Sequence, residues 1–215
     1  MIDIYLLRHG KVTGKAALYG HTDISVSCEE NARIAANLSA LSLDLKQVMT
    51  SPLLRCHAVA EQVAHQQALP LRVARDLSEM HFGDLDGVPF DTMSTQEWQT
   101  LEPFWVNPSQ TSLPNAESLN DFHTRVVRYW ASLATQKQNT LVVTHGGVIR
   151  MILAHLLELD WTNAKWYSTL SIQNGSLTHI QINPKFPEHV LIKAIGTPIK
   201  GPNDDESYLG SDDCL

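Results

Sequence analysis

Two histidines occupy positions that favour chemistry. His9 stands between Arg8 and Gly10 directly after an apolar run, and His145 precedes a glycine pair directly after another. An isolated histidine is more often structural, but a histidine beside glycine at the end of a strand lies where α/β proteins build ligand sites. Glycine lets a ligand approach backbone amides, which favour an anion. The sequence therefore predicts an anion site that contains both histidines.

The elements around these histidines alternate between strands and helices. Apolar runs predict strands at residues 2–7, 47–50, 71–74, 140–144 and 189–195. Helical spacing after a capping-box pattern, after a Ser-Pro pair and from the glycine pair onward predicts helices from Ser27, from Ser51 and from Gly146 to Leu157. This alternation predicts a three-layer α/β/α fold with a mostly parallel central sheet, whose ligands bind beyond the carboxyl ends of the strands.

Residues 82–124 break the alternation. They hold six aromatic residues, four prolines and no lysine or arginine, and we interpret them as a lid inserted between strands. Farther along, two alternating runs at 166–172 and 176–182 predict a hairpin. We expect one domain over residues 1–200 and an acidic, solvated tail over 201–215.

Composition limits the class of protein. The 215 residues are 43% hydrophobic and 18% charged, and they contain no apolar run near the roughly 20 residues of a membrane helix. The net charge is −7, of which five units follow Lys200, so the chain lacks the basic surplus of a nucleic-acid binder. We therefore expect neither a membrane nor a nucleic acid as a partner.

Three cysteines without a CxxC pair disfavour a disulfide framework and a structural zinc site. The apolar stretch at the amino terminus is short and lacks the cleavage signal of an export peptide. We expect a cytoplasmic protein, and the oligomeric state is left open.

Four motifs follow one another in the first 150 residues: LLRHG (6–10), SPLLR (51–55), LSEMHFGDLDG (77–87) and VVTHGG (142–147). In this order they resemble the histidine phosphatase, or phosphoglycerate mutase-like, superfamily, and most of all its alpha-ribazole phosphatase branch. The resemblance implies a phosphomonoesterase that uses His9 as nucleophile and Glu79 as proton donor. It also implies that Arg8, Arg55 and His145 bind the phosphoryl group, and that the substrate is alpha-ribazole 5'-phosphate of cobalamin biosynthesis.

The residue types agree with that chemistry. Nearby guanidinium groups of Arg8 and Arg55 disfavour a proton on His9, and a neutral imidazole is the nucleophilic form. Two such groups, together with amides such as that of Gly146, supply stabilisation of the transferring phosphoryl group. We expect no metal and no cofactor.

Other mechanisms fit the sequence less well. A cysteine phosphatase needs Cys followed six positions later by Arg, and the residues six beyond Cys28 and Cys56 are Ile34 and Gln62. An aspartyl-phosphate enzyme matches Asp84-Leu-Asp-Gly-Val88, but no apolar strand precedes that motif. A catalytically weak binding relative also stays open.

The lid and the loop after His9 bear on the substrate. Seven acids and no fixed cation in 82–124 are expected to repel a second phosphate, which disfavours a mutase or a sugar bisphosphatase but leaves a broad-specificity or sugar-phosphate phosphatase as an alternative. Aromatic residues such as Trp105 are candidates for stacking on an aromatic substrate, with packing within the lid as the alternative. The loop after His9 departs from the family pattern, in which an asparagine contacts the phosphoryl group, and Lys15 and His21 are candidates to replace that contact. The expected substrates are small-molecule phosphate monoesters.

Overall fold

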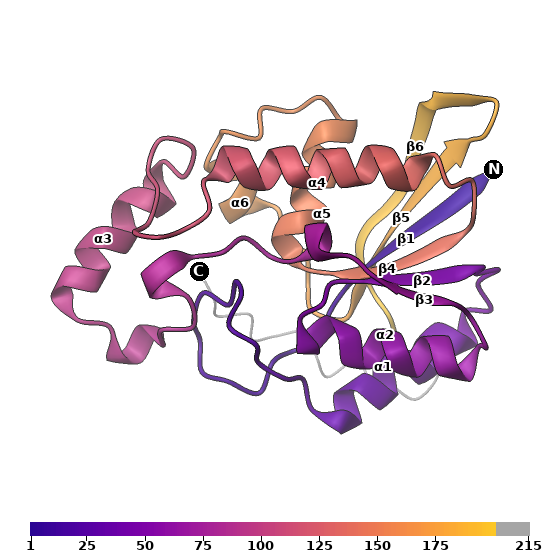
Figure 1. Cartoon of the computed structure of the whole chain (residues 1–215), viewed down its shortest axis with the longest axis horizontal. Coiled ribbons are helices and arrows are strands. Elements are labelled where there is room, and N and C mark those ends of the chain that lie inside the picture. Colours follow the sequence, from indigo (N-terminus) through magenta and orange to yellow (C-terminus); the bar gives the residue numbers. More distant parts are fainter. Residues whose placement is uncertain (201–215) are drawn as a thin grey trace.

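A six-stranded sheet in the order β3-β2-β4-β1-β5-β6 forms the centre of the molecule (Figure 1). The computed structural model describes residues 1–200. Its strands are β1 (Ile2–Arg8), β2 (Gln47–Thr50), β3 (Leu71–Val73), β4 (Thr140–Thr144), β5 (Ser176–Asn183) and β6 (Phe186–Pro198). β3, β2, β4 and β1 are parallel, whereas β5 and β6 are antiparallel to their neighbours. The predicted α/β class and mostly parallel sheet are confirmed.

Helices cover both faces of this sheet. Figure 1 shows α1 and α2 on one side and α4 and α5 on the other. The helices are α1 (Cys28–Ala40), α2 (Leu54–Gln66), α3 (Thr95–Val106), α4 (Leu119–Ala134), α5 (Gly146–Leu156) and α6 (Lys165–Thr169). Because successive strand residues point to opposite faces, Leu6 belongs to the core under α4 and α5, and Leu7 to the core under α1 and α2.

The helix starts come partly from local sequence and partly from distant residues. Ser27 caps α1 as predicted, since its hydroxyl accepts from the Glu30 amide. The reciprocal half of the expected capping box is replaced by an ion pair, in which the Glu30 carboxylate binds Arg33 at 2.8 Å. At α2 the Leu54 amide donates to Asp23 at 2.6 Å, an acceptor that lies 31 positions earlier in the chain.

The expected hairpin between residues 166–172 and 176–182 is wrong. Residues Lys165–Thr169 form α6, and β5 pairs with β1 and β6 instead. Trp166 donates through its indole nitrogen to the Arg150 carbonyl at 3.1 Å, so this run packs on α5 as a helix. The Gln173–Gly175 turn docks on the end of β1, where the Gly175 amide donates to the Arg8 carbonyl at 3.1 Å.

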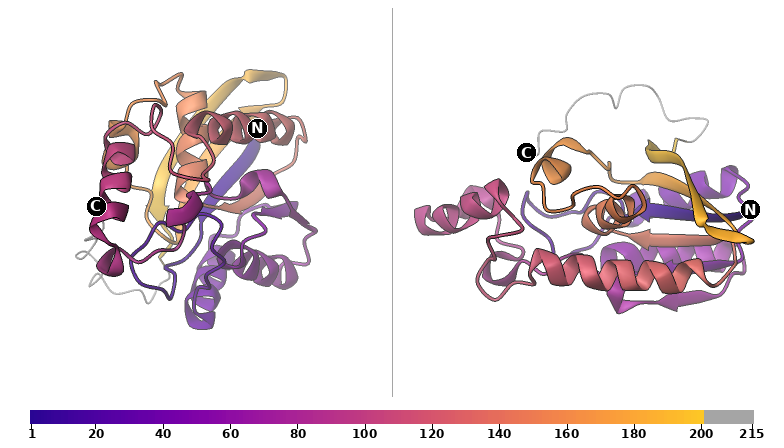
Figure 2. Two further views of the ribbon diagram at one scale, coloured as in Figure 1. Left: turned by 60° about the vertical axis from the view of Figure 1, so that its left-hand side comes forward. Right: turned by 90° about the horizontal axis from the view of Figure 1, so that it is seen from above.

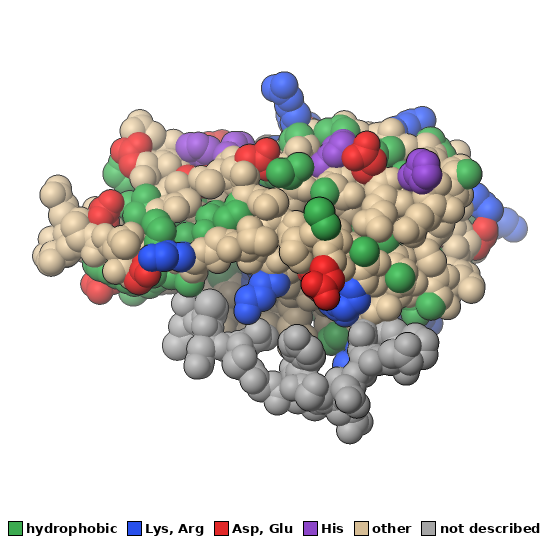
Figure 3. Space-filling model, turned by 90° about the horizontal axis from the view of Figure 1, so that it is seen from below, with side chains coloured by type: hydrophobic (Ala, Val, Ile, Leu, Met, Phe, Trp, Pro, Cys, Tyr) green, Lys and Arg blue, Asp and Glu red, His purple; other side chains and the backbone are tan. Residues whose placement is uncertain are grey.

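The segment between β3 and α4 carries three short 3-10 turns and α3. These turns are η1 (Arg75–Leu77), η2 (Gly83–Leu85) and η3 (Phe90–Thr92). In the view from above, α3 extends beyond the edge of the sheet (Figure 2), and Trp98 and Trp105 on α3 pack against Phe90. Hydrophobic side chains gather toward this end of the molecule on the face seen from below (Figure 3).

Two expectations concern the ends and the surface of the chain. The predicted acidic tail at 201–215 lies outside the described residues. Within residues 1–200 no helix is both long and apolar enough to span a membrane.

Packing of α1 predicts a difference between two neighbouring leucines. Leu38 is 1% exposed in the core and Leu41, at the end of the helix, is 45% exposed. We expect Leu38→Ala to lower the free energy of unfolding by about 2 to 5 kcal/mol, because it leaves a cavity, and Leu41→Ala to change it by less than about 0.5 kcal/mol. Urea unfolding measures both, and equal losses would contradict the assigned face of α1.

Candidate active site

Parallel pairing of β1 with β4 brings His9 and His145 together. Arg8 lies opposite Thr144 in the register, and the His9 amide donates to the Thr144 carbonyl at 3.1 Å. Each histidine is the next residue after its strand, so the two rings meet at the carboxyl edge of the sheet with centroids 5.2 Å apart. The two histidines predicted to share a site therefore do so.

The hydrogen bond of His9 fixes its tautomer. Its Nδ1 lies 2.8 Å from the Gly10 carbonyl oxygen, which only accepts, so Nδ1 carries the proton and Nε2 holds a lone pair. The ring is nearly fully buried, and burial lowers the pKa of His9 well below its usual value, with Arg8 and Arg55 adding to the effect. Burial is thus a larger cause than the two arginines that the sequence emphasised.

His145 is held in a different state. Arg55 donates through Nε to Nδ1 of His145 at 3.2 Å, so the ring proton is on Nε2 and points to the Ser51 hydroxyl at 2.8 Å. Burial, followed by the charge of Arg55, lowers the pKa of His145 well below its usual value. His145 is therefore neutral, and in this structure its Nε2 proton is bound to the Ser51 hydroxyl.

Arg55 is fully buried, and most of its N–H groups donate hydrogen bonds to the loop after β1. Its Nη2 donates to the Tyr19 and Gly20 carbonyls at 2.9 and 2.7 Å, and Nη1 donates to the Thr22 carbonyl at 3.0 Å. The position of Arg55 in the first turn of α2, predicted from Ser51-Pro52, makes this reach possible. Arg55 therefore shapes the loop beside His9 as well as adding positive charge there.

Asp86 holds the same loop from the other side. Its carboxylate accepts from the amides of Gly20, His21 and Thr22 at 3.2, 2.7 and 2.9 Å, and from Phe82 at 3.1 Å. These hydrogen bonds outweigh burial and lower the pKa of Asp86. The carboxylate that would belong to an aspartyl-phosphate motif is thus a structural acceptor.

Asp84, the residue that would be phosphorylated in such an enzyme, is exposed and accepts from the Asn115 amide at 2.9 Å. Across residues 1–200 no group of three or more His, Cys, Asp or Glu side chains could hold a metal ion. In this structure Asp84 and Asp86 both serve as hydrogen-bond acceptors for other parts of the chain.

Two guanidinium groups flank Gly146 at the start of α5. A Cβ built on Gly146 would lie 3.2 Å from Nη1 of Arg150 and 3.4 Å from Nε of Arg8. Arg8 also donates through Nη1 to the Ile172 carbonyl, and Arg150 donates to the Leu170 carbonyl through two nitrogens at 2.9 and 2.7 Å. Positive charge therefore converges on a helix amino terminus, an arrangement that favours an anion.

Glu79 reaches the same helix start. Its carboxylate accepts from the amides of Gly147 and Met80 at 3.0 and 3.1 Å. A Cβ on Gly147 would lie 2.3 Å from the Glu79 carboxylate, so the second glycine of the pair makes room for Glu79, and its amide serves that carboxylate. By contrast, the missing side chain of Gly10 makes room for Glu30 and Ile34 of α1.

A cavity of about 530 Å³ opens beside Glu79 and Gly147. Its walls are mainly apolar and come from the loop after β1, from the segment before α4, from α4 and α5, and from the region of α6. They include Leu18, Phe82, Phe104, Trp105, Phe122 and Leu170. Among the described residues that line it, Glu79 is the one carboxylate and Arg150 the one guanidinium. A pocket of this size and lining suits a small molecule held by a few polar groups.

The remaining predicted contacts fall in different places. Trp105 lines the cavity and is 39% exposed, and His21 contacts the Glu79 carbonyl through Nε2 at 3.1 Å. Lys15 instead forms an exposed ion pair with Asp91 at 2.8 Å.

None of the seven acids in 82–124 lines the cavity. The expected repulsion of a second phosphate is therefore not supported by the geometry.

Sequence reasoning missed Arg150 and Asp86 as parts of the site. Arg150 had a local signal, since it follows Gly146 by four positions and lies one helical turn away on the same face of α5. Asp86 had only a misleading signal, because its motif resembles that of another phosphatase class, while three of its four amide partners lie more than 60 positions earlier in the chain.

Comparisons with known proteins agree with this geometry. A family model for the histidine phosphatase superfamily (branch 1) matches residues 4–194. The adenosylcobalamin/alpha-ribazole phosphatase of Escherichia coli K12 is 30% identical over 191 residues, which cover 85% of this chain and 91% of the relative.

Solved structures show the same fold. The alpha-ribazole phosphatase from Shigella flexneri superposes with a TM-score of 0.76 at 25% identity, covering 94% of this chain and 100% of the other. Bacillus stearothermophilus YhfR reaches a TM-score of 0.80 at 21% identity, covering 92% and 98%. With two histidines at neighbouring strand ends and a family match over almost the whole described chain, the protein belongs to the histidine phosphatase superfamily, branch 1, and is a phosphatase.

Proposed function

We propose that the protein hydrolyses phosphate monoesters through a phosphohistidine formed on His9, without a metal ion. The observation that carries this proposal is the state of His9: its Nδ1 proton is bound to the Gly10 carbonyl, and its pKa is lowered by burial and by two arginines. An uncharged Nε2 with a free electron pair is the form of imidazole that attacks phosphorus.

The reaction then follows from the neighbouring groups. Nε2 of His9 forms a bond to phosphorus as the bond from phosphorus to the ester oxygen breaks, and Glu79 gives its proton to that oxygen. Arg8 and Arg150, with the start of α5, stabilise the charge on the transferring phosphoryl oxygens. Water next attacks phosphorus, Glu79 takes a proton from it, and His9 leaves as the neutral base.

The cavity indicates the remainder of the substrate. Its apolar wall, with Phe82, Phe104 and Trp105, suits a flat, uncharged ring system. Because the E. coli and S. flexneri relatives are named alpha-ribazole phosphatases, we propose alpha-ribazole 5'-phosphate as the substrate.

Arg150 favours a second candidate substrate class. In this alternative Arg150 binds the rest of the substrate instead of the transferring phosphoryl group, which would suit a phosphate ester whose remainder carries another anionic group, as in a bisphosphate or a phosphoglycerate. The ratio of kcat/KM for alpha-ribazole 5'-phosphate to that for 2,3-bisphosphoglycerate separates the two, and a preference for the bisphosphate would replace our assignment.

The first prediction concerns the nucleophile. We expect His9→Ala to abolish turnover of an aryl phosphate and of alpha-ribazole 5'-phosphate, because no other group forms the intermediate. Rapid quenching of wild-type protein should trap acid-labile, base-stable phosphate on His9, and turnover should persist in EDTA. Label on an aspartate, or strict Mg²⁺ dependence, would contradict the mechanism, and absent turnover in the wild type would indicate a binding relative.

The neutral state of the histidines predicts how stability depends on pH. His9 and His145 have pKa values lowered well below 6.5 in the folded protein, whereas in the unfolded chain each binds a proton near pH 6.5. As pH falls below about 6.5 the unfolded state takes up more protons, so stability falls by up to about 1.4 kcal/mol per pH unit for each histidine.

Urea unfolding between about pH 7.5 and about pH 5 measures this slope, because that range brackets the histidine pKa of about 6.5 in the unfolded chain. We expect His9→Asn to reduce it, and the exposed His65→Asn to reduce it less. An unchanged slope in His9→Asn would show that His9 is protonated in the folded protein.

Trp105 predicts substrate selectivity. If the cavity receives an aromatic ring, Trp105→Ala should lower kcat/KM for alpha-ribazole 5'-phosphate, with a loss of about 1 to 3 kcal/mol of transition-state stabilisation. The kcat/KM for glycerol phosphate should be nearly unaffected. Val106→Ala is the matched control, since Val106 follows Trp105 on α3 and is 77% exposed. Equal losses on both substrates would mean that Trp105 only packs α3.

A further inference from the structure

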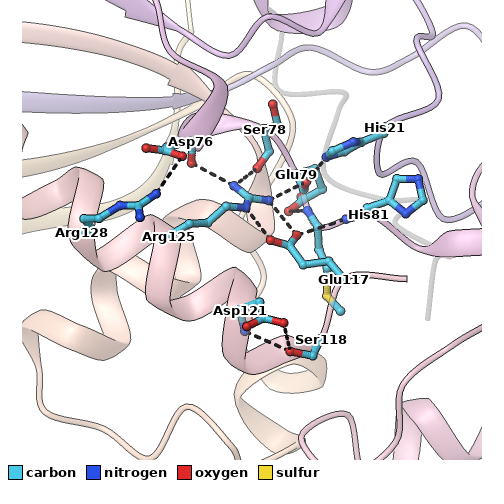
Figure 4. Close-up of polar contacts among 11 residues, drawn as sticks. His21, Asp76, Ser78, Glu79, His81, Glu117, Ser118, Asp121, Arg125 and Arg128 are labelled. Carbon is cyan, nitrogen blue, oxygen red and sulfur yellow. Dashed lines mark hydrogen bonds and ion pairs between the residues drawn. The ribbon is translucent and has the colours of Figure 1, made fainter. Parts of the chain in front are cut away.

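Arg125 on α4 reaches under the segment that carries Glu79. Its Nη1 donates to the Asp76 and Ser78 carbonyls at 2.9 and 2.8 Å, and its Nη2 donates to the Glu79 carbonyl at 2.9 Å (Figure 4). The other two donors bind the Glu117 carboxylate, from Nε at 2.6 Å and from Nη2 at 2.9 Å. All five N–H groups of this guanidinium therefore have an acceptor.

The pair of Arg125 and Glu117 is largely removed from solvent. The two side chains are 16% and 17% exposed, and the guanidinium lies 4.8 Å from the centre of the Phe122 ring. A buried ion pair contributes little net stability compared with an apolar replacement. The fixed fork geometry of the Arg125 guanidinium, however, specifies where its hydrogen-bond acceptors lie.

The segment held by Arg125 has little regular structure of its own. After the short β3 the chain forms a single 3-10 turn at Arg75–Leu77 and then has no regular structure up to Phe82. Besides Arg125, the Thr144 hydroxyl binds the Leu77 carbonyl at 2.8 Å, and His21 contacts the Glu79 carbonyl. Arg125 is the group that gathers several of these carbonyls at once.

We propose that Arg125, charge-paired with Glu117, is a positioning residue for proton transfer by Glu79. By fixing the backbone on both sides of Glu79, it holds the carboxylate against the Gly147 amide at the start of α5, beside the cavity. This inference rests on the proposed function, in which Glu79 protonates the leaving oxygen. Arg125 touches neither the phosphoryl group nor the leaving group in this role.

Leaving-group chemistry tests the proposal. An alkyl phosphate needs its leaving oxygen protonated, whereas 4-nitrophenyl phosphate releases a stable phenolate that needs no proton. Arg125→Met should lower kcat/KM for the alkyl ester on the order of a hundredfold and for the nitrophenyl ester by less than about threefold.

The matched control is Arg128→Met, because Arg128 lies on the same helix, reaches Asp76 at 3.5 Å and is exposed. It should change neither ester by more than about twofold. An equal loss on both esters in Arg125→Met would reduce Arg125 to general support of the fold and overturn the proposal.

A double-mutant cycle with Glu79→Gln completes the test. Glu79→Gln alone should produce the same selective loss on the alkyl ester, and Arg125→Met should then add less than about twofold in that background. Losses that multiply would contradict an action through Glu79. If Glu79→Gln shows no selective loss, Glu79 is not the donor, and that part of the proposed function falls together with the inference.

Thermal unfolding monitors the fold of each variant. If Arg125→Met does not fold, Glu117→Gln takes its place, because it keeps the shape and removes the charge that orients the guanidinium. It should show the same dependence on leaving group with a smaller amplitude, and Arg125→Lys should not restore the wild-type ratio, since lysine lacks the fork. A wild-type ratio in Glu117→Gln would overturn the role of the pair.

Discussion

Buried and half-buried guanidinium groups that donate to backbone carbonyls organise the carboxyl edge of this sheet. Arg55 gathers three carbonyls of the loop after β1, Arg125 gathers three around Glu79, and Arg150 binds the Leu170 carbonyl twice. A guanidinium removed from water needs acceptors in its own plane. Loops that carry no regular structure supply them, and so the arginines fix the loops while the loops keep the positive charge in place. One kind of interaction thus explains both the shape of the site and its preference for an anion.

Burial, together with these charges, keeps the histidines neutral. His9 and His145 lie at the ends of adjacent parallel strands, where burial and the guanidinium groups both disfavour a proton. Hydrogen bonds then give the two rings different tautomers: His9 donates from Nδ1 and keeps Nε2 open, whereas His145 accepts at Nδ1 and donates from Nε2. Two residues of one type, about 5 Å apart in ring centres, therefore suit different roles, a nucleophile and a hydrogen-bond donor.

In the proposed function, substrate choice and chemistry use largely different parts of the molecule. The groups proposed to react lie at the ends of β1 and β4, on α5 and in the segment after β3, whereas the cavity wall comes mainly from the connection around α3 and from the region of α6. The acids of that connection serve other ends: Asp86 accepts loop amides, Glu97 caps α3 and Glu117 orients Arg125. Counting charges along the segment misjudged the cavity, because a carboxylate acts on a ligand only where its side chain faces the ligand.

The sequence by itself determined the α/β class, most of the strands and helices, and the meeting of His9 with His145, because hydrophobic periodicity and glycine-terminated strands are local signals and parallel strands share one edge. Only the tertiary structure decided what pairs with what. It turned the expected strand at 166–172 into α6, tied Lys15 to Asp91, and brought Arg150 to Gly146 and Arg125 to Glu79. Apart from Arg150, whose spacing on α5 was a local signal, these outcomes depend on partners far apart in the chain. The physical reason is that a buried polar group is satisfied by whichever acceptor the packing brings within reach, and sequence spacing carries no record of that distance.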